Sequence, residues 1–513
     1  MTDGRPQGID TAPHDPDVAT GLRVEKHPVL DLVVDLCDRL QAAGVRYCHW
    51  KSNDYIDRSA SGENDLDLLV ARDDLGEFLA VLHVLGFKEA RPRAGRQIPG
   101  VRHFYGHDER SGRIVHVDAQ AHLVVGDDTT KNVRIPMEDA YLATARRTGV
   151  FALPAPEVEL AVLVLRIALK RGTLDSTLSG LGSPSTGERR ELEWLWERAD
   201  LDVVRDVVTT HLAVVGWERW IAFAEAVRSG AGASTRLRAG RAVVAAMAPW
   251  SRRSPAADGF VRTVRRVDWV LRRVVLRQRN SKRLVANGAV IALIGGDGAG
   301  KSTAVDGLSR WLGGPLQVQH VHLGKPPKSL TTLAVKGGTA AGRALGLWRT
   351  TWLPHYPTAA ERAGVTPPLA WLAWQAATAR DRRRQYTRAT RAAARGRLVV
   401  SDRFPMPQIT LMDGSRTRWV DTEALGPLGR RLVAAERGSY ARMPLPDVLV
   451  VLRVDPDIAV ARKRGVDPAE FVRPRSQEVY DADWTGSGVA VVDAGQSADA
   501  VLRDVRRIVW AKL

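Results

Sequence analysis

The 513-residue chain has little cysteine and no long apolar run. Its two cysteines, Cys37 and Cys48, lie outside any CxxC or Cys/His cluster, so neither a disulfide framework nor a structural zinc site is expected. Charged residues such as Arg166 interrupt the apolar stretches before they reach the roughly 18–20 residues of a membrane span. The first 25 residues carry no apolar signal-peptide core, and we therefore expect a cytoplasmic protein.

Acidic residues are also in the minority, with 58 Asp and Glu against 75 Lys and Arg, for a net charge of +17. The excess is uneven: residues 1–150 carry 19 basic and 24 acidic side chains, whereas residues 251–290 carry 11 and 2. No helix-turn-helix, RNP or zinc-finger pattern accompanies the basic residues, so nucleic-acid binding is not favoured. The length exceeds the roughly 250–300 residues of one core, which predicts several domains.

The N-terminal part combines helical and strand-like patterns. Residues 1–27 are predicted to be a disordered leader, and residues 28–150 a small α/β domain. Its expected helices are 28–43 and 75–85, and its expected strands are 45–50, 65–71, 101–105 and 113–120.

The rest of the chain divides into a helical and an α/β part. Residues 151–286 show helical periodicity and are predicted to form a helical connector, with a Ser/Gly/Pro-rich break at 179–187. From residue 287 to 513, apolar strand runs alternate with helical segments, which predicts a parallel sheet with helices on both faces. The expected strands are 289–294, 317–323, 397–401, 447–454 and 489–492.

A phosphate-binding motif, G-x-x-x-x-G-K-[ST], follows the apolar strand 289–294. Glycines let such a loop curl, so that its N–H groups and the next helix N-terminus point at phosphate oxygens. The lysine adds positive charge and the serine hydroxyl binds Mg²⁺, which predicts ATP and Mg²⁺ as cofactors. The motif residues are Gly295, Gly296, Asp297, Gly298, Ala299, Gly300, Lys301, Ser302 and Thr303.

Further charged residues indicate where an acceptor and a metal ion bind. Asp402 and Arg403 follow the strand 397–401, at the edge where ligands of parallel sheets bind. Asp402 is a candidate metal ligand, and Arg403 and Arg382 are candidate clamps on an acceptor phosphate. Arg462 and Arg464 lie on a later helix and are candidates for closing over the transferred phosphoryl group, although a solvated basic helix end is the alternative.

These motifs, with Leu445-Pro446-Asp447, resemble thymidylate kinase along nearly all of residues 288–513. The resemblance implies phosphoryl transfer from ATP to a phosphorylated acceptor such as dTMP. It places Asp297 near the acceptor sugar, Arg382 and Arg403 on the acceptor phosphate, and the arginines of 462–475 in a lid.

Two segments depart from the thymidylate kinase pattern. Residues 322–327, His-Leu-Gly-Lys-Pro-Pro, stand where the family usually has Arg-Glu-Pro-Gly, which makes Lys325 a further candidate for acceptor binding. Residues 405–408, Pro-Met-Pro-Gln, replace the start of the family's stretch that contacts the base. Both departures concern the acceptor, so kinase chemistry is predicted more firmly than dTMP.

A second constellation lies near the N-terminus. Ser52, followed by Asp65-Leu66-Asp67, resembles the nucleotidyltransferase fold, in which alternate strand carboxylates share one face and bind metal ions. Asp118 is the expected third carboxylate, and Lys51 departs from the usual glycine. Two alternatives remain: Asp65 and Asp67 cap or solvate an edge strand, or the module is folded but degenerate.

A basic helix is predicted within residues 260–284, with apolar positions at helical spacing between arginines. It either contacts an anionic membrane surface peripherally or packs against the kinase-like domain, and we favour packing. A homodimer is compatible with the sequence.

The leading hypothesis is an α/β protein in which a nucleotidyltransferase-like domain and a helical connector precede a thymidylate-kinase-like P-loop kinase. One alternative is a nucleotidyltransferase acting through Asp65, Asp67 and Asp118. The other is an ATP-gated regulatory or scaffold protein of surface-polysaccharide assembly.

Overall fold

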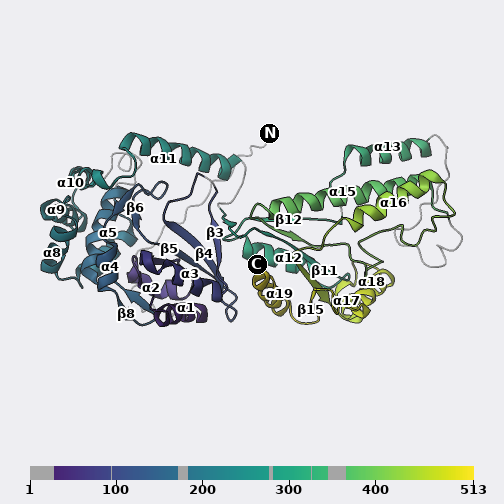
Figure 1. The fold of residues 1–513 in the computed structure, drawn as a ribbon, viewed down its shortest axis with the longest axis horizontal. Helices are drawn as coiled ribbons and strands as arrows, with labels where there is room; N and C mark the ends of the chain where they lie inside the picture. Colours follow the sequence, from purple (N-terminus) through teal and green to yellow (C-terminus); the bar gives the residue numbers. More distant parts are fainter. Residues whose placement is uncertain (1–27, 94, 172–182, 276–280, 325, 345–365) are drawn as a thin grey trace, which may run out of the picture.

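A computed structural model describes residues 28–93, 95–171, 183–275, 281–324, 326–344 and 366–513. The predicted leader 1–27 and Lys325 lie outside these ranges, as does part of the predicted break at 179–187. The fold is mixed α/β with a parallel sheet and many helices, as predicted. Figure 1 shows two halves side by side along the long axis, with strand β3 (Lys88–Arg91) near their junction.

The N-terminal half contains a six-stranded sheet in the order β1-β2-β5-β4-β3-β10. Neighbouring strands are antiparallel except β2 and β5, which are parallel. The strands that the sequence predicts at 45–50, 65–71, 101–105 and 113–120 are confirmed. They are β1 (Tyr47–His49), β2 (Leu66–Val70), β4 (Val101–His107) and β5 (Ile114–Gln120).

Strand β10 (Arg283–Leu284) corrects the sequence prediction, which extends the helical connector through these residues. It pairs antiparallel with β3, so the chain returns to the N-terminal sheet before it enters the second half. The pairing joins residues almost two hundred positions apart, and local periodicity contains no information about such a partner.

Helices cover both faces of the N-terminal sheet. Alternate residues of β2 and β5, including Leu68 and Val117, pack in one buried cluster with Leu36 and Phe78 of the predicted helices at 28–43 and 75–85. These helices are α1 (Asp31–Ala42) and α3 (Leu75–Val84). Short elements complete this half: α2 (Ile56–Ala60), α4 (Glu138–Thr144), β6 (Leu123–Val125), β7 (Val133–Ile135), β8 (Arg146–Thr148) and β9 (Phe151–Leu153).

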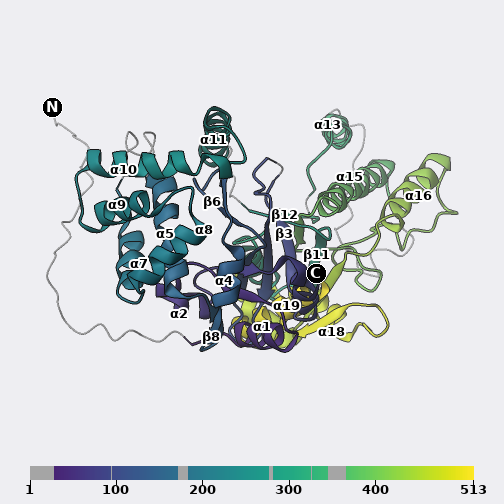
Figure 2. The same cartoon turned by 60° about the vertical axis from the view of Figure 1, so that its left-hand side comes forward.

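The predicted helical region packs on the opposite face. Cys48 and Leu69 of the sheet share a buried cluster with Leu165 and Trp220, and the Trp220 indole donates a hydrogen bond to the Ala161 carbonyl at 3.0 Å. The helices therefore cover this sheet as well as connecting two parts of the chain (Figure 2). They are α5 (Pro156–Arg171), α7 (Thr186–Trp196), α8 (Leu201–His211), α9 (Trp217–Arg228) and α10 (Ala233–Ala246).

Helix α11 (Pro255–Val270) is continued by a π-helical turn at Leu271–Val275. The face that it turns toward the protein is the opposite of the one that we expected. Arg265 donates to the Thr129 carbonyl at 2.7 Å and Arg266 pairs with Asp127 at 3.1 Å, so these arginines face the protein. The apolar side chains of Phe260, Val267 and Val274 are 71%, 60% and 66% exposed. Hydrogen-bond acceptors in the 127–131 loop bind the basic face of α11. The expectation that the apolar face of this helix packs against the protein is therefore wrong.

The second half contains the predicted parallel sheet, whose five strands have the order β12-β13-β11-β14-β15. Leu308 and Val505 cover one face, and Tyr386 and Ala389 cover the other. The strands are β11 (Ala289–Gly295), β12 (Val318–Val321), β13 (Leu398–Ser401), β14 (Val448–Arg453) and β15 (Ala490–Asp493). The helices are α12 (Lys301–Leu312), α13 (Leu330–Ala344), α15 (Leu369–Ala393), α16 (Pro427–Ala441), α17 (Pro456–Lys463), α18 (Ala469–Asp481) and α19 (Ala498–Lys512).

The two halves share one buried cluster. Ala90 and Tyr105 of the N-terminal sheet belong to the same hydrophobic core as Leu308 of α12 and Val505 of α19. The Trp311 indole of α12 donates to the Gly112 carbonyl at 2.9 Å, across the junction. The two halves are therefore in contact through buried, packed side chains. The predicted domain boundaries remain predictions. Within the described ranges, no helix combines the length and the apolarity needed to cross a bilayer.

Candidate nucleotide-binding site

The predicted phosphate-binding loop lies between β11 and α12, where its motif places it. Gly298 has a φ of +82°, and a Cβ atom there would lie 2.6 Å from the carbonyl oxygen of Ala459 in α17. At Gly296, a Cβ atom would lie 2.6 Å from the Cα atom of Ser476 in α18. The two glycines therefore allow the loop to curl and to pack closely against two helices.

Lys301 begins α12 and folds back on the loop. Its Nζ atom donates hydrogen bonds to the carbonyl oxygens of Gly295 and Gly296, at 2.9 and 2.6 Å. Burial lowers the pKa of Lys301 to about 8, because a buried ammonium group loses its hydration. Ser302 and Thr303 are exposed in the first helical turn, beside the free N–H groups of the helix N-terminus.

Asp402 and His322 follow neighbouring strands at the same edge of the sheet. The Nδ1 atom of His322, after β12, lies 2.7 Å from both carboxylate oxygens of Asp402, after β13. Because β13 also neighbours β11, this pair lies near the phosphate-binding loop, and the Asp402 charge acts on Lys301. His322 begins the segment that stands where thymidylate kinases usually have Arg-Glu-Pro-Gly, and its role as the partner of Asp402 was not predicted.

Asp297 in the loop is held by α18. Its carboxylate pairs with Arg475 at 2.7 Å, and its carbonyl accepts a hydrogen bond from the Ser476 hydroxyl at 2.9 Å. Burial would raise the pKa of Asp297, but Arg475 and Lys301 outweigh it and hold the pKa below its ordinary value. A lid arginine predicted from the sequence is thus in direct contact with the loop.

Arg382 and Arg403 converge on one carboxylate, that of Asp413. Arg403 lies 3.2 Å from Asp413 and Arg382 lies 3.9 Å from it. Arg382 is buried and also donates to the Leu323 carbonyl at 2.8 Å and to the Tyr440 hydroxyl at 2.6 Å. The structure therefore brings the two predicted clamps together around an anionic group.

Asp413 lies in a segment without regular structure, and the sequence did not single it out. Two glutamates hold this segment: Glu436 accepts from the Arg416 backbone at 2.7 Å, and Glu478 accepts from the Leu411 backbone at 2.9 Å. No periodic pattern or motif marks such a position. The available signal was Asp413 itself, the one acidic residue between Phe404 and Val420, followed by Gly414 and Ser415.

Arg462 and Arg464 are not brought to the phosphate-binding loop in the same way. Arg462 donates to the carbonyl of Ala494 at 2.8 Å and so holds the turn after β15. Arg464 is exposed just beyond the end of α17. Lys325 lies outside the described residues.

The three N-terminal carboxylates lie together on one face of the other sheet. Asp67 of β2 is directly beside Asp118 of β5, and Lys51 pairs with Asp67 at 2.9 Å. His116 Nδ1 lies 2.7 Å from Asp65. Ser52 has a φ of 58°, and its N–H donates to Glu191 of α7 at 3.0 Å.

Two histidines add to this N-terminal group, and neither was singled out from the sequence. His103 and His116 both lie beside Asp118. Burial would raise the pKa of Asp118, but the adjacent His103 and His116 hold it well below its ordinary value. Burial would lower the pKa of His116, but Asp118 and Asp65 outweigh burial and raise it.

Comparisons with known proteins bear on less than half of the chain, and no protein-family model matches it. An uncharacterized ATP-binding protein, YghR of Escherichia coli, is 27% identical over 228 residues, which are 43% of this chain and 86% of that protein. A thymidylate kinase of Thiobacillus denitrificans is 29% identical over 232 residues, which are 43% of this chain and 96% of the kinase. These sequence matches support a P-loop kinase-like region in about 43% of the chain.

Among solved structures, a deoxyadenosine kinase from M. mycoides with bound dATP covers 43% of this chain and 97% of its own, at 14% identity and a TM-score of 0.26. The comparisons leave the N-terminal nucleotidyltransferase-like domain a prediction.

Proposed function

We propose that the protein is an ATP-dependent kinase that transfers the γ-phosphoryl group to a phosphorylated acceptor, most simply a deoxynucleoside monophosphate such as dTMP. The observation that carries the proposal is the convergence of Lys301, Asp402 and Arg403 beside a phosphate-binding loop. The charges of Asp402 and Arg403 both act on Lys301 there. The matches to an ATP-binding protein and to a thymidylate kinase support the same class of activity.

Each residue of this site has a chemical role in the proposal. Lys301 leaves the carbonyls of Gly295 and Gly296 and binds the β- and γ-phosphates of ATP, which restore full protonation of its ammonium group. Ser302 and Asp402 supply hard oxygen ligands that fit Mg²⁺, and the bound ion would offset phosphate charge. Arg403 neutralises charge on the oxygens of the transferred group.

The position of the Asp413 carboxylate supports the proposal that the acceptor carries a phosphate group. It occupies a place between Arg403 and Arg382, at 3.2 and 3.9 Å, where an anion is favoured by two guanidinium groups. We propose that the acceptor phosphate displaces Asp413 from Arg403 when it binds. The choice of dTMP as acceptor follows from the thymidylate kinase resemblance. Because residues 322–327 and 405–408 depart from that family's pattern, the test panel must also contain other monophosphates.

Neither alternative function is favoured. The N–H of Ser52 and the carboxylate of Asp67 are both engaged, by Glu191 and Lys51, which does not support a triphosphate site at these groups. A scaffold role requires only ATP binding, and it predicts that no acceptor is phosphorylated.

The test is incubation of the protein with γ-labelled ATP, Mg²⁺ and a panel of nucleoside monophosphates and sugar phosphates, with products identified by mass spectrometry. We expect ADP together with one phosphorylated product, and loss of both in Lys301→Ala. Lys512→Ala removes an exposed lysine at the end of α19 and serves as the matched control. Unchanged turnover in Lys301→Ala would falsify the proposal.

A further inference from the structure

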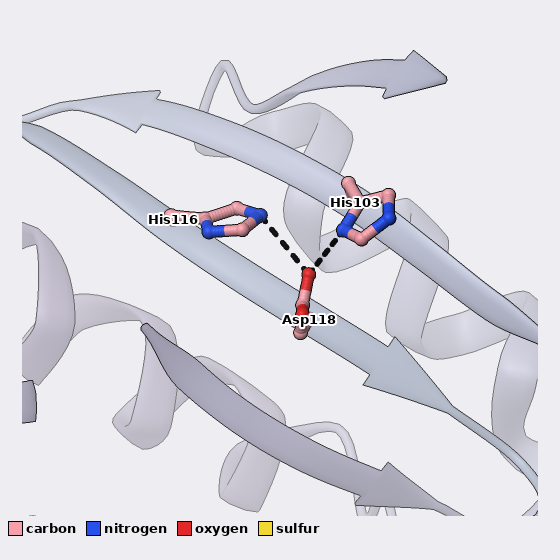
Figure 3. Close-up of side chains that lie close together, drawn as sticks. All are labelled: His103, His116 and Asp118. Carbon is pink, nitrogen blue, oxygen red and sulfur yellow. Dashed lines mark hydrogen bonds and ion pairs between the residues drawn. The ribbon is translucent and has the colours of Figure 1, made fainter. Parts of the chain in front are cut away.

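We propose that His103, His116 and Asp118 form a binding site for a divalent transition-metal ion, and that the metal's open side receives a phosphate-bearing small molecule. Figure 3 shows the three side chains converging from two neighbouring strands. The site lies on the N-terminal sheet and involves none of the kinase residues. It also differs from the carboxylate triad predicted from the sequence, because two of its three ligands are imidazoles.

The strand register brings the three ligands together. His103 of β4 is directly opposite Asp118 of β5, and His116 lies two residues before Asp118 on the same face. One ligand atom from each side chain lies within 4.8 Å of the other two. The His103 and His116 rings stack with centroids 5.5 Å apart, and both rings direct a nitrogen at the same carboxylate oxygen (Figure 3).

One ring nitrogen points to a ligand that is not part of the protein. His116 Nε2 is buried and lies 3.0 Å from the Asp118 carboxylate, but the two groups are not aligned for a hydrogen bond. Buried polar atoms are usually hydrogen-bonded, so a buried nitrogen without a hydrogen bond needs an explanation. A metal ion between His116 Nε2, His103 Nδ1 and Asp118 supplies one.

The surroundings of His116 resemble those of metal-bound histidines in general. Its other nitrogen, Nδ1, lies 2.7 Å from the Asp65 carboxylate, which orients the ring and leaves Nε2 as the ligand. The Tyr105 ring stacks on the imidazole, with centroids 4.5 Å apart and an interplanar angle of 9°. These contacts hold the ring in one orientation before any metal binds.

The donor set selects the class of metal. Two imidazoles and one carboxylate suit zinc, cobalt, nickel, copper or iron, whereas Mg²⁺ prefers oxygen ligands. Lys51 is paired with Asp67 at 2.9 Å, so an ammonium group already neutralises the carboxylate that a magnesium pair would need. Three protein ligands leave a fourth position of a tetrahedral ion open, as in catalytic zinc sites.

A cavity lies beside His103. It has a volume of about 370 Å³, and His103 is part of its wall. Cationic side chains outnumber acidic ones in the lining, where Asp128 is the acidic member among the described residues. The cationic lining residues are Arg96, Arg265, Arg266 and Lys282. Arg96 and Arg266 already pair with Asp268 and Asp127, whereas Arg265 and Lys282 contact neutral groups, the Thr129 carbonyl and the Tyr105 hydroxyl. Arg265 and Lys282 therefore keep positive charge for an anion, and a phosphate group can bind both such cations and a metal ion.

The metal is tested with the full-length protein after removal of bound metals by a chelator. In excess Mg²⁺, which saturates oxygen-donor sites, we expect one equivalent of Co²⁺ to bind with the visible absorption of a low-coordinate, nitrogen-ligated ion. We expect His103→Ala and His116→Ala to lose this equivalent, and His211→Ala, an exposed histidine at the end of α8, to retain it.

A result that does not depend on variant folding comes from the unmodified protein with Cu²⁺. Electron paramagnetic resonance should show coupling to two imidazole nitrogens. Co²⁺ binding unchanged in His103→Ala and His116→Ala, or a Cu²⁺ spectrum without nitrogen coupling, would overturn the metal site.

The ligand is tested by adding inorganic phosphate to the Co²⁺-loaded protein. We expect the absorption spectrum to change saturably, and Lys282→Ala and Arg265→Ala to weaken phosphate binding about tenfold each, as for charge-assisted hydrogen bonds. Arg507→Ala, on the far helix α19, is the control. A spectrum unchanged by phosphate would overturn the ligand and leave the metal standing.

Discussion

Asp413 is the side chain whose charge most directly opposes an acceptor phosphate. Replacing it by asparagine in Asp413→Asn leaves Arg403 and Arg382 without their carboxylate partner at 3.2 and 3.9 Å. Because the Arg403 side chain is 32% exposed, solvent screens its ion pair with Asp413 in part, and the pair contributes on the order of 1 kcal/mol. We therefore expect KM for the phosphorylated acceptor to fall about twofold to fivefold. Steady-state kinetics at saturating ATP measure the change, with KM for ATP as the internal control. A raised acceptor KM would contradict a place for phosphate between the two arginines.

Glu159 makes the stability of the N-terminal half depend on pH. Burial, and then the nearby Glu191 charge, raise the pKa of Glu159 to about 8 from an ordinary value of 4.5. Between these values the folded protein holds a proton that the unfolded chain releases. The free energy of unfolding therefore falls as pH rises from about 5 to 8, by up to about 1.4 kcal/mol per pH unit.

The variant Glu159→Gln removes this titration and keeps an oxygen acceptor for the Asn53 amide, which lies 2.8 Å away. We expect urea unfolding of the variant to show a flatter dependence on pH over this range. Glu218→Gln, at an exposed position of α9, should leave the dependence as it is. If the free energy of unfolding depends on pH equally in Glu159→Gln and in the unmodified protein, Glu159 is ionised in the folded state.

The phosphate-binding loop depends on its packing against α17 and α18. Gly298→Ala adds a methyl group at a φ of +82°, 2.6 Å from the Ala459 carbonyl, so the loop must move. With a strain of about 1–3 kcal/mol, we expect ATP affinity to fall at least about fivefold. Isothermal titration calorimetry measures the affinity, and Gly337→Ala is the control because a Cβ atom there meets no atom within 4 Å. Full ATP affinity in Gly298→Ala would mean that this loop conformation is not the one that binds.

Elements that depend on local pattern were predicted well. The strands β11, β13 and β14 consist mostly of apolar residues, with Gly or Asp within two residues of their ends, and the sequence places them within one or two residues. β10 was missed because two residues carry no periodicity and its partner is distant in sequence. The periodicity of α11 identifies an apolar and a basic face, but the partners in the 127–131 loop decide which face turns inward.

The candidate site was predictable where a motif encodes backbone geometry, as at Lys301 and Gly298. It was not predictable where tertiary contacts bring unrelated segments together. His322 meets Asp402, and Arg403 meets Asp413, through strand order and loop packing. Arg382 illustrates the same limit, because its buried contacts with Leu323 and Tyr440 were not visible in a pattern of charges.

The two halves of the molecule are expected to unfold together. Trp311 contacts the Gly112 carbonyl, the His107 ring at 5.0 Å and the Trp510 ring at 5.6 Å. We expect Trp311→Ala to lower the free energy of unfolding by about 2 kcal/mol, because this large, partly buried side chain packs against both halves. Urea titration followed by hydrogen exchange in both halves checks this. Trp269→Ala, at a 44% exposed position, should change stability by about 0.5 kcal/mol or less. Separate transitions for the halves would contradict the shared core.

The junction also affects the order in which the chain can fold during synthesis. The Trp510 indole donates to the Gly86 carbonyl at 3.2 Å, and these partners are 424 residues apart. The ribosome therefore releases Gly86 and the edge of β3 long before β10 and α19 exist to cover them. Until then, the newly made N-terminal sheet presents an open strand edge to which other chains can pair. We therefore expect a chaperone to be needed chiefly at this edge and during this interval of synthesis.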